Sequence, residues 1–123
     1  MSGTRAIVEA FWHRMRDNDW AGAAQLFSSG FELNWPQSGE RFDAEGFVAV
    51  NSQYPTEGLW RFDVSFILVD GSEAVSRAEV SDGAVQATVI SHFVIEQDRI
   101  AAMTEFWPEP YEPPAWRRDL SKV

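Results

Sequence analysis

The 123-residue sequence contains no cysteine, and it also lacks long apolar runs. The absence of cysteine excludes a disulfide framework, a thiolate metal site and a cysteine nucleophile, and it fits a reducing cytoplasm. No stretch approaches the roughly 20 apolar residues that span a bilayer, and no basic segment followed by an apolar run marks a secretory signal. We therefore expect a cytoplasmic protein with no membrane partner.

Basic residues are scarce, with 10 Lys and Arg against 19 Asp and Glu, for a formal net charge of -9. A protein that neutralises phosphates needs clustered basic side chains, so nucleic acid is not an expected partner. Histidines and carboxylates do not recur at metal-ligand spacing on one element, and the glycines do not form a phosphate-binding pattern. We expect neither a metal nor another cofactor.

Aromatic residues are abundant, with six tryptophans and nine phenylalanines. The length suits one domain that buries roughly 65 to 70 per cent of its unfolded surface. We assign residues 1–107 to this domain and residues 108–123 to a C-terminal arm, because four prolines between 108 and 114 favour an extended, polyproline-like chain. Such an arm could lie across a pocket or embrace a neighbouring subunit.

Apolar spacing predicts three helices in the first half of the chain. Residues 4–16 carry an apolar stripe after a candidate N-cap at Thr4, and Asp19 can cap a second short helix that runs through Phe27. Residues 28–30 should form a turn, followed by a strand over 31–35 and a polar loop over 37–42. The third helix should begin after Asp43 and end near Tyr54, because Pro55 disfavours a helical residue before it.

From Trp60 onward the apolar period changes to two, which is typical of strands. The residues expected on one face of the first strand are Trp60, Phe62, Val64, Phe66 and Leu68. Asp-Gly pairs at 70–71 and 82–83 predict tight turns, so that strands over 73–81, 84–96 and 100–107 follow in a meander. The fold class is therefore α+β, with three N-terminal helices packed on a curved antiparallel or mixed sheet.

Glu105 is the leading candidate for a functional side chain. Strand alternation places it on the same face as Met103 and Trp107, among apolar groups. An unpaired buried carboxylate is costly, so it should have a partner, a raised pKa or a function. A salt bridge to an arginine such as Arg61 or Arg117 is the structural alternative.

Two more polar residues lie on faces that should point inward. Ser91 interrupts the apolar side of the 84–96 strand, and Asn51 lies on the inner stripe of the third helix. Together with Glu105 they would be the polar anchors of an apolar ligand pocket. Alternatively, Ser91 bonds a carbonyl group and Asn51 caps a loop. The aromatic walls of the pocket would be Trp35, Tyr54, Trp60 and Trp107, and Phe11 and Met103 are also expected to contact the ligand.

The two histidines are weaker candidates. His92 is adjacent to Ser91 in the strand and so points to the opposite, outer face, which it shares with Gln86, Thr88, Ile90 and Val94. That face is mixed in polarity, and we expect it to pack against a second copy in a homodimer. His13 should lie at the polar edge of the first helix.

The order of elements and the closing pattern Arg99-Ile100-x-x-Met103-x-x-Phe106-Trp107 resemble the cone-shaped nuclear transport factor 2-like fold, and within it the SnoaL-like group that includes polyketide cyclases. The resemblance runs from Ile7 to Trp107. It is moderately specific for fold and poor for function, because this scaffold hosts isomerases, cyclases, dehydratases, hydrolases and binding modules.

The resemblance also implies roles for particular positions. The functional groups of ketosteroid isomerases would fall on Phe11, Trp35 and Ser91, and since none of these side chains can replace them, that activity should be absent. SnoaL-like cyclases place a general base on the last strand, where this chain has Glu105. Their partner histidine corresponds to Ser91 and not to His92.

Three hypotheses follow. In the first, the protein is an enzyme in which Glu105 removes a proton next to a carbonyl of a small apolar or cyclic molecule, and Asn51 or Ser91 stabilises the oxyanion. In the second, the same pocket binds a ligand without transforming it. In the third, the interior is filled by its own side chains, and the outer sheet face is an interaction surface.

Overall fold

The computed structural model describes residues 3–122, so residues 1 and 2 of the expected domain and residue 123 of the expected arm lie outside the described residues. The helices of the body are α1 (Thr4–Arg16), α2 (Trp20–Ala24) and α3 (Ala44–Gln53). The strands are β1 (Phe27–Trp35), β2 (Glu40–Phe42), β3 (Arg61–Asp70), β4 (Glu73–Ser81), β5 (Gln86–Glu96) and β6 (Arg99–Phe106). A short helix, α4 (Ala115–Arg118), lies near the C-terminus.

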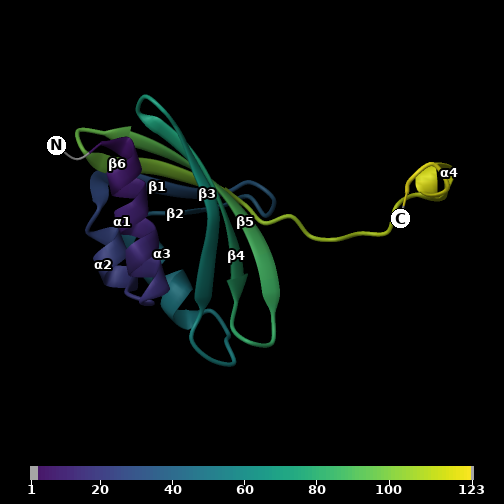
Figure 1. The fold of residues 1–123 in the computed structure, drawn as a ribbon. Coiled ribbons are helices and arrows are strands. Elements are labelled where there is room, and N and C mark those ends of the chain that lie inside the picture. The colour runs from purple at the N-terminus through teal and green to yellow at the C-terminus, as the bar shows by residue number, and fades with distance from the viewer. Residues whose placement is uncertain (1–2, 123) are drawn as a thin grey trace.

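The strands form one six-stranded sheet in the order β2-β1-β6-β5-β4-β3. β1 pairs with β6 in parallel and every other neighbouring pair is antiparallel, so the sheet is mixed. The sheet curves, and α1, α2 and α3 cover one of its faces (Figure 1). This arrangement confirms the predicted α+β class with helices on a curved sheet. None of the helices in residues 3–122 is long and apolar enough to cross a membrane.

The core lies between α1, α3 and the concave face of the sheet, and it is rich in aromatic rings. Phe11 of α1 is central, with ring centroids 5.1 Å from Trp12, 5.5 Å from Phe93 and 6.1 Å from Phe47. Phe27 of β1 stacks on Phe31 at 3.6 Å. Buried aromatic side chains contribute the largest apolar areas to a small core, so these contacts hold the helices onto the sheet.

The apolar stripe of α1 is buried as predicted, but its cap differs from the prediction. Gly3 is the N-cap and Thr4 is the first helical residue, with its hydroxyl donating to the carbonyl oxygen of Gly71 at 2.7 Å. Asp19 caps α2, because its Oδ1 accepts from the Gly22 amide at 2.9 Å. α2 ends at Ala24, earlier than expected, because the chain enters β1 at Phe27.

Two segments that we expected to be turn or loop are strand. Residues 28–30 belong to β1, where pairing with β6 shifts register between Phe27 and Glu32, so an irregularity accommodates the small residues. Residues 40–42 form β2 and pair with Leu33, Asn34 and Trp35. The conformation of both segments is set by pairing with distant strands and not by the local preference of their residues for turns.

The predicted face of β3 is correct only in its first half. Pairing with β4 shifts register between Val64 and Phe66, as in a β-bulge, and the alternation of side chains changes face there. Phe62 and Val64 are partly buried, whereas Phe66 is 40% and Leu68 62% exposed. Ile67 packs on the core instead.

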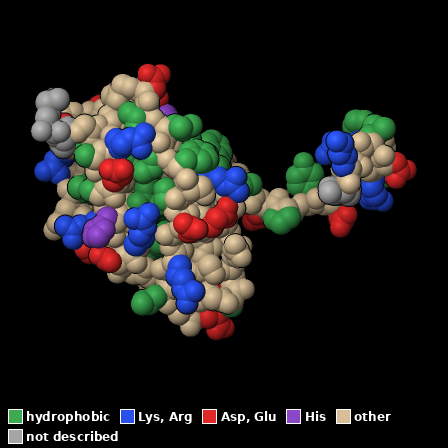
Figure 2. Space-filling view, in the orientation of Figure 1, with side chains coloured by type: hydrophobic (Ala, Val, Ile, Leu, Met, Phe, Trp, Pro, Cys, Tyr) green, Lys and Arg blue, Asp and Glu red, His purple; other side chains and the backbone are tan. Residues whose placement is uncertain are grey.

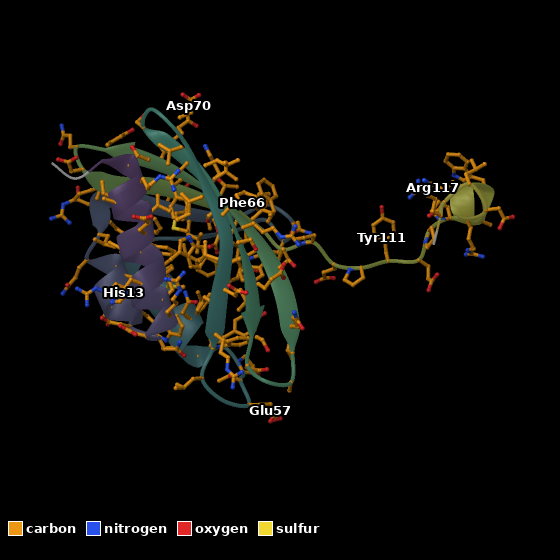
Figure 3. The ribbon with its side chains drawn as sticks, in the orientation of Figure 1. His13, Glu57, Phe66, Asp70, Tyr111 and Arg117 are labelled. Carbon is orange, nitrogen blue, oxygen red and sulfur yellow. The ribbon has the colours of Figure 1, made fainter. Side chains whose placement is uncertain are left out.

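The C-terminal segment extends away from the body and carries α4 at its far end (Figure 1). Tyr111 and Trp116 are 78% and 75% exposed, and Figure 3 shows Tyr111 and Arg117 far from the sheet. The extended course agrees with the proline-rich sequence, while the single helical turn of α4 was not expected. The described residues of the arm beyond Glu109 therefore do not lie across the pocket of the same chain.

Candidate functional site

A cavity of about 520 Å³ opens between the helices and the concave face of the sheet. Its floor comes from β4, β5 and β6, and its walls come from α1, α3, the end of β1 and the first residues after β6. The lining residues are Trp12, Met15, Trp35, Gln37, Ser38, Glu40, Phe47, Asn51, Tyr54, Trp60, Phe62, Val80, Val85, Ala87, Val89, Glu105, Trp107 and Glu109. The volume falls in the range of sites for small organic ligands.

Glu105 lies in this cavity and is only 6% exposed. The antiparallel register of β5 and β6 sets Ser91 directly opposite it, and Ser91 Oγ donates to Glu105 Oε2 at 3.2 Å. On the other side, Trp35 Nε1 at the end of β1 donates to Glu105 Oε1 at 3.1 Å. Each carboxylate oxygen therefore accepts one hydrogen bond from a neutral donor.

Burial raises the pKa of the Glu105 carboxyl above its ordinary value, and the hydrogen bonds from Trp35 and Ser91 offset part of this effect. Within residues 3–122, Glu105 takes part in no ion pair, so neither Arg61 nor Arg117 is its partner. A carboxyl with a raised pKa and no counter-ion is better suited to accept a proton than an exposed glutamate.

Five other residues expected at the site line the cavity: Trp35, Asn51, Tyr54, Trp60 and Trp107. Tyr54 and Trp60 meet edge to face at the rim, with ring centroids 5.9 Å apart. Asn51 Nδ2 donates to the Phe47 carbonyl oxygen of its own helix at 2.9 Å, which satisfies one of its two amide hydrogens without capping a loop. The indole nitrogen of Trp107 is buried and has no hydrogen-bond partner among the described residues.

The other three expected residues lie behind the cavity wall. Ser91 is fully buried and reaches the site only through Glu105. Met103 and Phe11 are fully buried in the core and do not line the cavity. None of these three residues is among those that line the cavity, and each lies behind residues that are.

A buried serine in β4 extends the polar row and was not anticipated. Ser76 pairs in register with Ser91, so Ser76, Ser91 and Glu105 lie side by side on the inner face of three adjacent strands. Trp12 Nε1 donates to Ser76 Oγ at 3.0 Å. Strand alternation with Ala74, Ala78 and Val80 was the sequence signal that could have found Ser76.

The rim below the cavity is organised by Asp82 in the β4–β5 turn. Its Oδ1 accepts from the amides of Ala84 and Val85 at 2.9 and 2.7 Å, and its Oδ2 accepts from the amide of Glu57 at 2.9 Å. These backbone hydrogen bonds lower the pKa of Asp82 to about 2. The turn and the loop before β3 are therefore joined by one ionised carboxylate.

A separate groove of about 630 Å³ lies outside the core, between α1 and β3. Its polar lining consists of exposed charged side chains, namely Arg5, Glu9, His13 and Arg16. It contains no buried polar group comparable to Glu105. His92, for its part, lies on the outer sheet face, where its Nε2 is 2.7 Å from Glu73 Oε1. We therefore place the candidate site in the inner cavity.

Helices on one face of a curved mixed sheet, with a cavity between the layers, define the nuclear transport factor 2-like class of proteins. The sequence model of the SnoaL-like domain family matches residues 8–103, and the chain belongs to that family. No curated protein matches the chain.

Solved structures agree with this assignment. A provisionally assigned ketosteroid isomerase from Kribbella flavida is 26% identical, with a TM-score of 0.86 over 98% of this chain and 88% of that one. An NTF-2 like protein of unknown function from Burkholderia xenovorans is 21% identical, with a TM-score of 0.78 over 98% and 94% of the two chains. A provisionally assigned polyketide cyclase from Sinorhizobium meliloti is 20% identical, with a TM-score of 0.68 over 80% and 92%. The last two likenesses support the fold alone.

Proposed function

We propose that this protein binds a small apolar or cyclic organic molecule in the inner cavity and catalyses a proton transfer on it, of the cyclase, isomerase or dehydratase type, with Glu105 as general base. The observation that carries the proposal is a buried carboxylate without a counter-ion that lines a cavity of ligand size. The lack of cysteine supports a cytoplasmic location.

The expected chemistry is removal of a proton from a carbon next to a carbonyl group. Glu105 takes the proton, the C–H electron pair forms the carbon–carbon double bond of an enolate, and the π pair of the carbonyl group moves onto its oxygen. Asn51, which lines the cavity from α3, has a second amide hydrogen to donate to that oxygen. Ser91 and Trp35 position Glu105 and are occupied in doing so.

Ketosteroid isomerisation is not part of this proposal, although one similar structure carries that provisional assignment. The positions that should hold its tyrosine, aspartate and second carboxylic acid are Phe11, Trp35 and Ser91 here. None of these side chains can supply a carboxylic acid or phenol at its position. The chemistry is therefore assigned to Glu105 alone.

The test is Glu105→Gln assayed on a panel of cyclic ketones and polyketide-like compounds by proton exchange in deuterated water. We expect exchange with the wild type and a loss of at least about a hundredfold in the variant, since a positioned general base typically contributes 10²–10⁴-fold. Glu96→Gln is the matched control, because Glu96 is an exposed carboxylate at the end of β5 and does not line the cavity. Exchange that survives in Glu105→Gln would refute the general-base role.

A binding module without catalysis is the alternative use of the same cavity. It is favoured by the absence of an acid that pairs with Glu105, because its two hydrogen-bond partners are a serine and an indole. Ligand binding measured by tryptophan fluorescence, with no proton exchange on any bound compound, would support the module. An interaction domain with a filled interior has less support, because the cavity is open to ligands of moderate size.

We also propose that the outer sheet face forms a homodimer interface. Phe66, Ile90 and Phe106 lie in one cross-strand row with Arg77. Figure 2 shows hydrophobic side chains gathered on this side of the body, in the region where Figure 3 labels Phe66. Exposed apolar rows flanked by polar residues are typical of subunit contacts.

The arm from residue 108 onward would belong to the same assembly. It makes few contacts with its own body, yet the Kribbella flavida match covers 98% of the chain and so includes most of the arm. Its tip carries Arg117, Arg118 and Lys122, whereas the protein as a whole is acidic. An aromatic and basic arm that leaves an acidic body is suited to dock on a second copy of that body.

A further inference from the structure

The charged residues that line the inner cavity are all acidic. They are Glu105 at the floor, Glu40 from β2 and Glu109 just beyond β6. No Lys, Arg or His is among the lining residues. Carboxylates around a cleft with low-dielectric walls concentrate cations and repel anions, so this cavity selects ligands by charge as well as by shape.

Aromatic residues make up seven of the fifteen other residues that line the cavity. Four tryptophans line the cavity, Trp12, Trp35, Trp60 and Trp107, together with Tyr54, Phe47 and Phe62. The rings lie on several elements, so a ligand in the centre is surrounded on different sides. Tryptophan and tyrosine faces attract alkylammonium groups through the ring quadrupole, and cages of such rings are a common way to bind them.

The floor of the cavity has a carboxylate that lacks a counter-ion. Its two hydrogen-bond partners, Ser91 and Trp35, are neutral, and it makes no ion pair within the described chain. An ionised carboxylate in such surroundings gains much from a cation, because little water is present to screen the attraction. A positively charged ligand would supply the missing partner.

We infer that the ligand of this cavity carries an alkylammonium or protonated amine group, held between the Trp and Tyr rings and paired with Glu105. The inference rests on the proposed function in one respect only, namely that the inner cavity is where the ligand binds. It adds the chemical class of the ligand. An amine fits this class in its protonated form. Compounds whose charged group is a carboxylate or a phosphate do not belong to it, because the acidic cavity repels them.

The test uses probes of the same shape and different charge on the full chain. Choline, 3,3-dimethylbutan-1-ol and 3,3-dimethylbutanoate present a cationic, a neutral and an anionic version of one branched group, and benzyltrimethylammonium adds a larger cation. Binding is measured by calorimetry and by the fluorescence of the cavity tryptophans. We expect the cations to bind at least about tenfold more tightly than the neutral alcohol and the anion to bind most weakly.

Two variants locate the effect. Glu105→Gln should weaken choline about tenfold and leave the neutral alcohol within about twofold. Glu96→Gln, which removes an exposed carboxylate at the end of β5 that does not line the cavity, should change neither. Because the three probes are also compared on the wild type, the test does not depend on the variant folding.

The inference is overturned if the neutral alcohol binds as tightly as choline, or if neither cation binds. Turnover of a neutral ketone that is lost in Glu105→Gln, together with no cation binding, would refute the inference and leave the proposed function standing. Cation binding without turnover of any compound would support the inference and identify the protein as a binding module.

Discussion

At the residue scale, Glu105 combines two opposing effects. Burial at 6% exposure disfavours its charge, while the Trp35 indole and the Ser91 hydroxyl stabilise that charge at 3.1 and 3.2 Å. Burial is the larger effect, so the pKa of the carboxyl is raised above its ordinary value. Keeping this side chain inside therefore costs stability at neutral pH.

Replacing Glu105 by Gln should change how stability depends on pH. Between the ordinary carboxyl pKa and the raised pKa of the folded protein, the unfolded chain releases this proton more readily than the folded chain. The free energy of unfolding of the wild type therefore falls by about 1.4 kcal/mol for each pH unit of that window. The variant lacks this loss and should gain stability relative to the wild type over the same window. Urea unfolding between pH 4 and 8 measures the difference, and a wild type that gains on the variant as pH rises would contradict it.

The hydrogen bond between Trp12 and Ser76 joins α1 to β4 inside the core. Trp12→Phe should destabilise the fold by about 1–3 kcal/mol, because it leaves the buried Ser76 hydroxyl without its donor. Ser76→Ala in the same background should recover part of this loss. A double-mutant cycle by chemical denaturation tests the pair, and a coupling energy near zero would show that the bond contributes nothing.

At the element scale, the pairing of strands brings the site together. The register of β5 with β6 aligns Ser91 with Glu105, and β1 contributes Trp35 because it lies parallel to β6. A bulge in β3 turns Phe66 and Leu68 outward, toward the face proposed for the dimer. Each of these positions depends on hydrogen bonds between segments that are far apart along the chain.

The turn between β4 and β5 should be sensitive to acid through Asp82. The pKa of this carboxyl is lowered to about 2, so its stabilising effect is fully present above the ordinary value near 3.8 and is lost as pH falls toward 2. Asp82→Asn should lower the melting temperature at pH 7, and the gap to the wild type should narrow between pH 4 and pH 2. Asp63→Asn, at an exposed position of β3, is the control. A gap that stays constant with pH would contradict the assigned role.

At the scale of the whole molecule, the arm stands out because the contacts within a single chain do not explain its exposed aromatic side chains. Tyr111 and Trp116 stay exposed although they are large and apolar, and Arg117 lies over the Trp116 ring at 5.8 Å. The arm leaves the body just after Trp107 and Glu109, which line the cavity. A second copy that received the arm would cover these aromatic side chains.

A chain that ends at Pro110 keeps Trp107 and Glu109 and removes the aromatic part of the arm. We expect its dimer to dissociate at least about tenfold more readily than that of the full chain, which corresponds to about 1.4 kcal/mol. The melting temperature of the dilute monomer should be unchanged, because the described part of the removed segment extends away from the body (Figure 1). Sedimentation at micromolar concentrations measures the dissociation, with Trp116→Ala as the point variant. A full chain that is monomeric there would refute the dimer.

The sequence by itself determined which side of each regular strand faces inward, since alternation with period two needs no partner. It thereby determined that Glu105 and Ser91 face the core, and it determined the ends of α1 and α3 through Asp17–Asp19 and Pro55. The order of the expected elements, together with the closing pattern of the last strand, was enough to identify the fold.

Only the tertiary structure decided what depends on contacts between distant segments. It paired β1 with β6 in parallel, which brought the Trp35 indole to Glu105 across 70 positions of sequence. It moved Phe11 and Met103 behind the cavity wall, reversed the face of Phe66, and directed the arm away from the body. The physical reason is that strand register and bulges are set by the free energy of the whole sheet. That free energy depends on contacts between distant segments, so a local sequence pattern does not determine it.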